Sequence, residues 1–223
     1  MAEAGEKLRL LCQKEGRAVY ISHLDLMRTM QRAFPRAGYA LKYSEGFNPH
    51  PLISILLPLG VGTESGCELM DFFLTEGAAL SELPGRLNRA LPEGIAALSA
   101  YAGGRKAREL KWLRVSGLLE YDRQTPEAVL PGLAEFFARE SIIIMKKTKR
   151  GEGESDIAPA IREIAFRPGA GGVALEAVVS AQEPTLNPEQ LVNALRQLAP
   201  ELAPDFAAFR RLEVYDTKME VFR

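Results

Sequence analysis

The chain is poor in the residues that most metal cofactors require. Its 223 residues include two cysteines, Cys12 and Cys67, and two histidines, His23 and His50. Without a third cysteine the chain cannot hold an iron–sulfur cluster alone. The cysteines lie far apart in apolar, strand-like runs, so we interpret them as buried thiols of a reducing compartment. Two histidines without a defined spacing do not form a metal motif, and we expect no metal site.

Long apolar segments and a strong net charge are also missing. The longest apolar run, 52–62, is interrupted by Ser54 and Pro58 and is too short to span a bilayer. The first residues contain no apolar stretch of the signal-peptide type. We therefore expect a soluble, cytoplasmic protein. The formal net charge of −1 provides no global argument for nucleic-acid binding, so such an argument must come from local patches.

Nucleotide-binding motifs are absent as well. Gly60 and Gly62 are not followed by a third glycine at the dinucleotide-binding spacing, and we interpret them as part of a turn. No phosphate-binding loop of the Gly-Lys-Ser/Thr type occurs. No motif in the sequence specifies a reaction.

The order of predicted elements repeats between the two halves, although no residue-level repeat is visible. Each half contains a strand, a helix, a strand, a long polar loop, a hairpin, a helix and a strand. In the first half we expect strands at Lys7–Lys14, 39–44, 52–57, 67–74 and 95–101, a helix after Ser22 that is ended or kinked by Pro35, and a helix at 79–91. In the second half we expect strands at 110–121, 141–145, 157–166, 173–179 and 210–215, and helices after Thr125 and at 187–198.

This pattern predicts an α+β protein of two ferredoxin-like domains in tandem, each with the order βαββ(β)αβ, as a pseudo-repeat. The Gly-rich, basic stretch 103–108 is the best boundary, so we expect domains at 1–104 and 105–223. The inner stripe of the first helix is expected to consist of Leu24, Met27, Met30 and Phe34.

The segment 43–51 is too polar, and too broken by glycine and proline, to belong to a core. Its potential binding side chains are Glu45, Phe47, Asn48 and His50. Pro49 and Pro51 stiffen the backbone on either side of His50, as is typical of a binding loop. A rigid connection whose polar groups face water is the alternative interpretation.

The first predicted helix carries a row of basic side chains. Ser22 is expected to be its N-cap, with Asp25 in the third position of a capping box. Arg28, Arg32 and Arg36 recur at a spacing of four, where like charges repel by a few tenths of a kcal/mol per pair. A row kept at this cost suggests an anionic partner such as phosphate, although a solvated helix face would look the same.

Basic patches and titratable groups supply further candidates. His23 lies beside a helix N-terminus, which favours a neutral imidazole able to serve as a hydrogen-bond acceptor or a general base. Catalytic candidates are His23, Asp25 and His50, and structural roles remain an alternative for each histidine. Candidate contacts to a nucleic-acid backbone are Arg105, Lys106, Lys146, Lys147, Lys149 and Arg150, the last four in an expected loop at 146–155.

Several uncommon motifs then occur in a characteristic order. They are Tyr-Ile-Ser-His-Leu-Asp at 20–25, Tyr-Ser-Glu-Gly-Phe-Asn-Pro-His-Pro at 43–51, Leu-Pro-Leu-Gly at 57–60 and Glu68. Together they resemble the radical-SAM-linked protein family, a bacterial domain of unknown function found beside, or fused to, a radical S-adenosylmethionine protein. The motifs cover the first third of the chain. The chain departs from the family at Pro35 and Leu52, where basic residues are usual.

The resemblance implies partnership with a radical SAM protein that uses S-adenosylmethionine and an iron–sulfur cluster, while this chain binds no cofactor itself. Our leading hypothesis is therefore an accessory, substrate-recognition protein, not catalytic alone, that binds RNA (tRNA or rRNA) or another phosphate-bearing substrate. The expected substrate-binding residues are Ser22, His23, Asp25, Arg28, Arg32, Tyr43, Ser44, Phe47, Asn48 and His50.

Two alternatives remain open at this point. One is a hydrolase or transferase that uses His23, Asp25 and His50, which requires these side chains to converge within hydrogen-bond reach. The other is a protein–protein interaction module without an RNA ligand. The arrangement of the 22–25 turn and the 48–51 loop, in one pocket or apart, discriminates between them.

Overall fold

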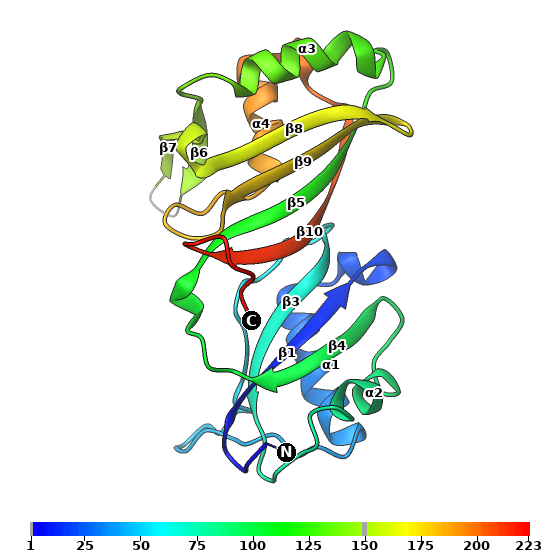
Figure 1. Cartoon of the computed structure of the whole chain (residues 1–223), viewed down its shortest axis with the longest axis vertical. Coiled ribbons are helices and arrows are strands. Elements are labelled where there is room, and N and C mark those ends of the chain that lie inside the picture. Colours follow the sequence, from blue (N-terminus) through cyan, green and yellow to red (C-terminus); the bar gives the residue numbers. More distant parts are fainter. Residues whose placement is uncertain (1, 149–150) are drawn as a thin grey trace. The chain divides into compact units, whose positions relative to one another are not determined.

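The computed structural model describes residues 2–148 and 151–223 (Figure 1). Its contacts divide the chain into two compact units, Met1–Ala107 with Phe222–Arg223, and Arg108–Val221. Both units combine α-helices with a sheet, and every strand pairing described within a unit is antiparallel. The expected α+β class is therefore confirmed. The boundary between the two units, between Ala107 and Arg108, falls inside the stretch 103–108.

In the first unit, the strands form a small sheet with helices packed on it. Its elements are β1 (Lys7–Lys14), a 3-10 helix η1 (Gly16–Tyr20), α1 (His23–Arg36), β2 (Ile53–Ile55), β3 (Glu64–Phe73), α2 (Leu83–Asn88), β4 (Ile95–Ala102) and the start of a second 3-10 helix η2 (Ala107–Glu109). β1 pairs with both β4 and β3, and β2 pairs with β3. Since residues 70–72 of β3 pair with both β1 and β2, the strand order is β4–β1–β3–β2.

The core of the first unit lies between this sheet and α1. Alternate residues of β1 (Leu8, Leu10 and Cys12) are buried in one cluster with the inner face of α1, as expected for a strand with one covered face. Phe34 of α1 contacts Phe72 of β3, with the ring centroids 4.8 Å apart.

The inner stripe of α1 differs from our expectation. Leu24 is 54% exposed, and Leu26 is buried instead. The buried residues of α1 are Leu26, Met30, Ala33 and Phe34. They follow the spacings of four, seven and eight that bring residues onto one helical face, and Leu24 lies off that stripe.

Helix α1 continues one residue past Pro35 and ends in a glycine cap. Gly38 has a positive φ of 82°. Its N–H donates to the Pro35 carbonyl (3.0 Å), and the Tyr39 N–H donates to the Phe34 carbonyl (2.9 Å). This pair of hydrogen bonds is a Schellman motif, which satisfies carbonyls that the helix end leaves free. The cap therefore keeps Arg36 in the last helical turn.

The second unit has the same kinds of element with one added hairpin. Its elements are β5 (Leu110–Glu120), α3 (Pro126–Phe137), β6 (Ile143–Thr148), β7 (Gly151–Asp156), η3 (Ala158–Ala160), β8 (Ile161–Gly169), β9 (Gly172–Ser180), α4 (Glu189–Leu198), η4 (Pro200–Leu202) and β10 (Phe206–Asp216). The strand order is β10–β5–β9–β8, and β6 pairs with β7 alone.

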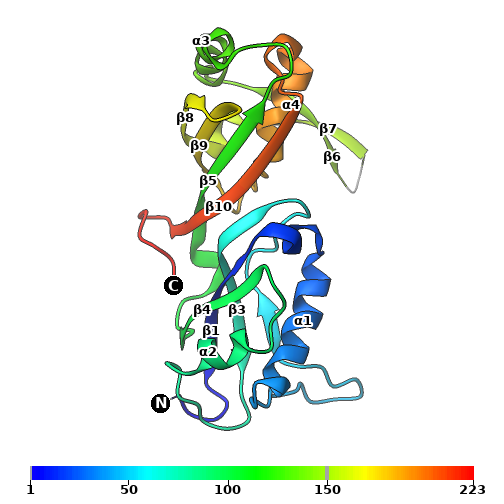
Figure 2. The same cartoon turned by 90° about the vertical axis from the view of Figure 1, so that its right-hand side faces the viewer.

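Helices α3 and α4 cover one face of the second unit's sheet and leave the other face open (Figures 1 and 2). On the covered face, Phe137 of α3 packs against Phe166 of β8, with ring centroids 5.5 Å apart. Alternate residues of β9, Val173 and Leu175, are buried there. Arg114 and Glu176 belong to the opposite, open face.

Several expected elements differ in extent from the observed ones, and three differ most. Segment 39–44 forms only single bridges, Leu41 with Leu74 and Tyr43 with Pro51, instead of a strand. The expected helix 79–91 is reduced to α2, which starts at Leu83 because Pro84 suits a first helical turn. The expected basic loop 146–155 is largely the β6–β7 hairpin.

Two glycines of the first unit provide a matched test of the α1 cap. Gly38→Ala should lower the free energy of unfolding by about 1 kcal/mol, because alanine is strained at positive φ. A Cβ at Gly38 would also collide with the Arg86 guanidinium. Gly85 lies in α2 with open space around it, so Gly85→Ala should instead raise the free energy of unfolding by about 0.5 kcal/mol. Urea unfolding followed by circular dichroism measures both, and equal stabilities of the two variants would contradict this account.

Candidate functional site

Ser22 caps α1 as the sequence predicts. Its Oγ accepts a hydrogen bond from the Asp25 N–H (3.2 Å) and donates one to Asp25 Oδ2 (2.7 Å). The other carboxylate oxygen accepts a hydrogen bond from Arg28 (3.1 Å). The Ser22 hydroxyl, followed by the Arg28 guanidinium, holds the pKa of the Asp25 carboxyl below its usual value. His23, the first residue of the helix, is exposed beside this cap.

The segment 43–51 is a hairpin that its own polar groups stiffen. The Ser44 N–H donates to the His50 carbonyl (2.9 Å), and the Ser44 Oγ accepts from the His50 N–H (3.1 Å). The same oxygen lies 2.9 Å from His50 Nδ1. Ser44 and His50 therefore have a structural role at the base of the hairpin. Phe47, near its tip, is 112% exposed, so the hairpin presents an aromatic ring to solvent.

The helix cap and the hairpin lie at opposite ends of the first unit's sheet. The cap follows η1 at the Lys14 end of β1, and the Lys14 ammonium lies 3.4 Å from the Val19 carbonyl. The base of the hairpin is at the other end, where the Lys42 N–H donates to the Phe73 carbonyl (2.8 Å) and Phe73 pairs with Lys7. Helix α1 of 14 residues, about 20 Å long, separates them (Figure 2).

This separation has a direct chemical consequence. His23 and Asp25 lie at the start of α1, whereas His50 belongs to the hairpin beyond its other end. Direct proton transfer needs donor and acceptor within about 3.2 Å. The three side chains therefore do not form the convergent catalytic group that a hydrolase or transferase would need.

The arginines of α1 form an exposed row, which we call the arginine row: Arg28, Arg32 and Arg36. Arg28 pairs with Asp25, but both side chains are largely exposed, so water screens the pair and the guanidinium stays available. Within residues 2–148 and 151–223, no ion pair joins Arg32 or Arg36 to a carboxylate. The row leads from the cap to the C-terminal end of α1.

A hollow of about 470 Å³ opens where the row ends. It is lined by Arg36, Ala37, Arg86, Arg89 and Ala90, and we call it the arginine hollow. Arg86 and Arg89 come from the end of α2 and were not among the predicted site residues. Their spacing of three on a short helix was the available signal, but only the packing of α2 near α1 brings them beside Arg36.

Two of the predicted contacts to nucleic acid are Arg105 and Lys106, and Arg105 has a structural role instead. The guanidinium of Arg105 stacks over the Phe222 ring at 4.7 Å, and Arg9 approaches the same ring at 4.9 Å. The Arg105 carbonyl also accepts a hydrogen bond from Arg9 (2.7 Å). Arg105 therefore helps to hold Phe222, which is buried. Lys106, its neighbour, is exposed.

The expected basic loop of the second unit is described only in part. Lys146 lies in β6, pairs with Gly153 and is half-buried. The backbone of Lys147 pairs with Glu152 in the same hairpin. Lys149 and Arg150, together with the Lys147 side chain, lie outside the described residues.

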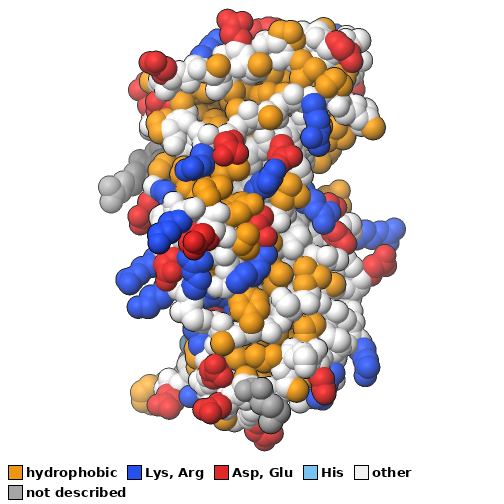
Figure 3. Space-filling view, in the orientation of Figure 1, with side chains coloured by type: hydrophobic (Ala, Val, Ile, Leu, Met, Phe, Trp, Pro, Cys, Tyr) orange, Lys and Arg blue, Asp and Glu red, His pale blue; other side chains and the backbone are white. Residues whose placement is uncertain are grey.

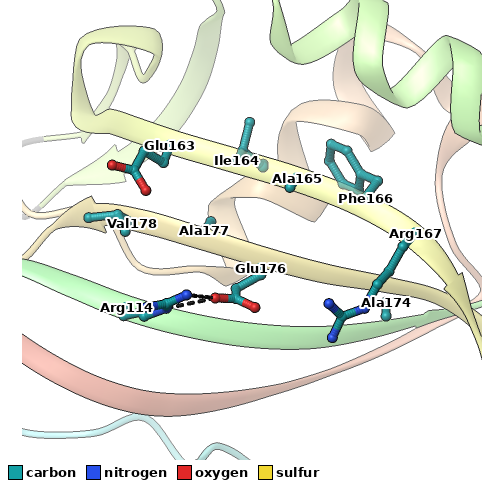
Figure 4. Close-up of a pocket in the computed structure, with 10 residues that line it drawn as sticks. All are labelled: Arg114, Glu163, Ile164, Ala165, Phe166, Arg167, Ala174, Glu176, Ala177 and Val178. Carbon is teal, nitrogen blue, oxygen red and sulfur yellow. Dashed lines mark hydrogen bonds and ion pairs between the residues drawn. The ribbon is translucent and has the colours of Figure 1, made fainter.

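The open face of the second unit holds a cavity of about 310 Å³ (Figure 4). Arg114 and Glu176 form an ion pair within it, and the carboxylate raises the pKa of the Arg114 guanidinium above its usual range. Glu163 and Arg167 line the same cavity. Side chains of both signs are interspersed with apolar ones over this face (Figure 3). The cavity therefore has less preference for an anion than the arginine hollow.

The described part of the chain offers little for cofactor chemistry. No group of three or more His, Cys, Asp or Glu side chains that could hold a metal ion occurs in it. Both cysteines are buried thiols outside any disulfide, and burial raises the pKa of the Cys12 thiol, which disfavours the reactive thiolate. Among the described helices, none has the length and apolar character needed to cross a membrane.

The site is thus a set of exposed cations and one exposed aromatic hairpin on a mixed α+β scaffold of antiparallel sheets. The chain belongs to a family described as "Uncharacterized protein conserved in bacteria (DUF2344)", whose model matches residues 7–188. The first part of the predicted resemblance, a bacterial family without an assigned function, is thereby confirmed. No curated protein matches the chain.

Two solved structures are similar to this chain at low sequence identity. A chain of a crystal structure titled "Crystal Structure of a Cbf5-Nop10-Gar1 Complex" aligns with a TM-score of 0.52 at 11% identity, over 93% of this chain and 48% of that chain. This protein therefore spans about half the length of that chain. A protein titled as an unknown protein from Galdieria sulphuraria aligns with a TM-score of 0.27 at 12% identity, over 92% of this chain and 98% of that chain. The first likeness bears on the fold alone.

The Ser22 cap makes a testable prediction for Asp25. Ser22→Ala should raise the pKa of the Asp25 carboxyl toward its usual value, since the hydroxyl is the main group that lowers it. Because the folded pKa lies below the unfolded one, the stability gained from Asp25 is present above about pH 4 and lost as the pH falls through the folded pKa. Carboxyl ¹³C chemical shifts against pH measure this change.

Asp156 in the second unit is the internal control for that titration. Its pKa is also lowered, chiefly by the hydrogen bond from the Ile142 N–H. Ser22→Ala should leave the Asp156 titration unchanged. An unchanged Asp25 titration in the variant would show that the cap does not control this carboxyl.

Proposed function

We propose that the protein is a substrate-recognition partner of a radical SAM enzyme and binds RNA (tRNA or rRNA) or another phosphate-bearing substrate. The motifs at 20–25 and 43–51 support the partnership, because they resemble those of proteins linked to radical SAM enzymes. In this proposal the protein is not catalytic alone. S-adenosylmethionine and the iron–sulfur cluster belong to the partner enzyme.

One observation carries the RNA-binding part of the proposal, namely the arginine row on α1. Its three guanidiniums are exposed at a regular spacing, and Arg32 and Arg36 have no carboxylate partner among the described residues. Guanidinium groups are well suited to phosphate, since they offer paired N–H donors and stay charged at every physiological pH. A helix that presents them at intervals of one turn matches a chain of phosphates better than an isolated small anion.

The hairpin supplies the second part of the proposed recognition surface. Phe47 and Asn48 project near its tip, and Tyr43 at its base is also exposed. An exposed ring on a stiff loop can stack on an unpaired base or insert into a partner protein at low entropic cost. We assign Phe47 and Asn48 to contact with a base or with the radical SAM partner.

The finer fold assignment also belongs to this proposal. We infer that each unit is ferredoxin-like, as a tandem pseudo-repeat. The strand order β4–β1–β3–β2 in the first unit has the same pattern as β10–β5–β9–β8 in the second. When the separate β6–β7 hairpin is left out of the count, each order places the first strand of its unit between the last and the third. A cytoplasmic location is proposed with it, because both cysteines are thiols outside any disulfide.

RNA binding is the first test. The purified protein should bind small RNA or tRNA, with an affinity that falls steeply as salt rises. The double change Arg28→Ala with Arg32→Ala should weaken binding by about tenfold or more and flatten the salt dependence, because two phosphate contacts are lost. Filter binding or fluorescence anisotropy at several salt concentrations measures both effects.

Two exposed arginines of the second unit, Arg123 and Arg196, provide the control. The change Arg123→Ala with Arg196→Ala removes the same net charge far along the sequence and should leave RNA binding almost unchanged. Binding that is absent in the wild type, or independent of salt, would count against the proposal. Equal losses in the two double variants would indicate a nonspecific charge effect.

The partner is tested separately through the hairpin. Phe47→Ala removes a side chain with no packing role, so it should not alter stability. It should reduce co-purification with the radical SAM protein encoded by the same organism if the ring contacts that partner. Co-purification that is lost with Phe47→Ala while no RNA is retained by the wild type would favour a pure interaction module.

A further inference from the structure

We propose that the arginine hollow, formed by Arg36, Arg86 and Arg89, is a binding site for a dianionic phosphate group. The ligand chemistry is that of a phosphate monoester, whether a terminal phosphate of a nucleic acid or a free phosphorylated small molecule. This site goes beyond the proposed function, since it would bind phosphate with or without an RNA.

Three arginines line one hollow, and they come from the ends of two helices. Arg36 belongs to the last turn of α1, Arg86 to the last turn of α2, and Arg89 is the C-cap residue of α2. The only other lining residues are Ala37 and Ala90, whose small side chains leave the space of about 470 Å³ open. The hollow is therefore large enough for a phosphate group with part of the molecule that carries it.

The three arginines of this hollow are not matched by carboxylates within it. Among the described residues, no carboxylate lines it. In the part of the chain that the structure describes, none of Arg36, Arg86 and Arg89 forms an ion pair. Like charges gathered around one space repel each other, and an anion bound among them removes that cost. Three cations favour a dianion over a singly charged group.

Acidic side chains line a different hollow, which shares Arg86 with this one. Glu76 and Glu82 line a neighbouring space of about 230 Å³ that Arg86 also borders. Arg86 thus separates an acidic hollow from the basic one.

Arg86 is held in position before any ligand binds. Its guanidinium stacks over the Tyr39 ring at 4.5 Å, and Tyr39 is buried. Gly38 allows this approach, because a Cβ there would collide with the guanidinium. An arginine fixed by stacking loses less conformational freedom on binding than a free one. The Schellman cap of α1 therefore also positions Arg86, one of the residues that line the arginine hollow.

Helix dipoles provide the competing explanation for these arginines. Cations near helix C-termini are stabilised by about 0.3–1 kcal/mol, and all three residues lie at such ends. This effect accounts for the sign of the charge at each helix end. It does not require that arginines of two helices line one hollow that has no carboxylate among its described lining residues. The two explanations differ in what they predict for ligand binding.

Inorganic phosphate is the probe for the site itself. Titration of the full-length protein at pH 8 and low salt, followed by calorimetry or ³¹P NMR, should show saturable binding. The change Arg86→Gln with Arg89→Gln should weaken it by at least about tenfold, as expected when two of three cations are lost. The matched control, Arg123→Gln with Arg196→Gln, should bind phosphate like the wild type. Circular dichroism and thermal unfolding verify that each variant is folded.

A second variant keeps the test independent of α2 stability. Arg36→Gln changes the hollow from the α1 side, and it should also weaken phosphate binding. If neither Arg36→Gln nor the α2 double variant changes the affinity, or if the wild type does not bind phosphate, the proposal is wrong. Loss of thermal stability without any change in phosphate affinity would support the helix-dipole explanation instead.

Paired oligonucleotides distinguish the sources of the phosphate. The same short RNA is compared with a 5′-phosphate and with a 5′-hydroxyl group. Tighter binding of the phosphorylated form, abolished by Arg86→Gln with Arg89→Gln, assigns the hollow to an RNA terminus. Binding of inorganic phosphate without any RNA binding would retain this site and overturn the RNA-binding function. RNA binding without any binding of free phosphate, and without an effect of the hollow variants, would retain the RNA-binding function and overturn the phosphate site.

Discussion

The packing of α1 against β1 and β3 is the contact on which the other features of the first unit depend. Met30 and Phe34 face the sheet, and the Phe34 ring lies against Phe72. Once the buried face of α1 packs on the sheet, only the opposite face of the helix is exposed to water. Arg28, Arg32 and Arg36 follow on the outer side because of the helical period. The direction of α1 along the sheet also sets the Ser22 cap and the 43–51 hairpin at opposite ends.

The separation of cap and hairpin changes the chemistry that the protein can support. A catalytic site built from His23, Asp25 and His50 needs contact between these groups. His23 and Asp25 lie at the start of α1, which is about 20 Å long, and His50 lies beyond its other end. Ser22 and Ser44 use their hydroxyls locally, one to cap the helix and one to brace the hairpin. What remains exposed is recognition chemistry, consisting of guanidiniums along a helix and an aromatic ring on a rigid loop.

Local sequence rules predicted the elements that carry strong short-range signals. The strand Lys7–Lys14 and the capping box at Ser22 agree with their patterns, because alternation and cap chemistry involve only neighbouring residues. The rules were less successful where several weak signals compete. The inner stripe of α1 was misplaced at Leu24, and 39–44 was expected to be a strand although it forms only isolated bridges.

The sequence by itself therefore determined the α+β class, the arginine row and the stiff aromatic hairpin, since each follows from periodicity or from the backbone limits of proline and glycine. Only the tertiary structure decided which of these features lie together. It separated His23 from His50, and it brought Arg86 and Arg89 to Arg36. Such contacts between distant residues depend on how the helices pack on the sheet. Residues 50 positions apart carry no local sequence signal that they will lie close together.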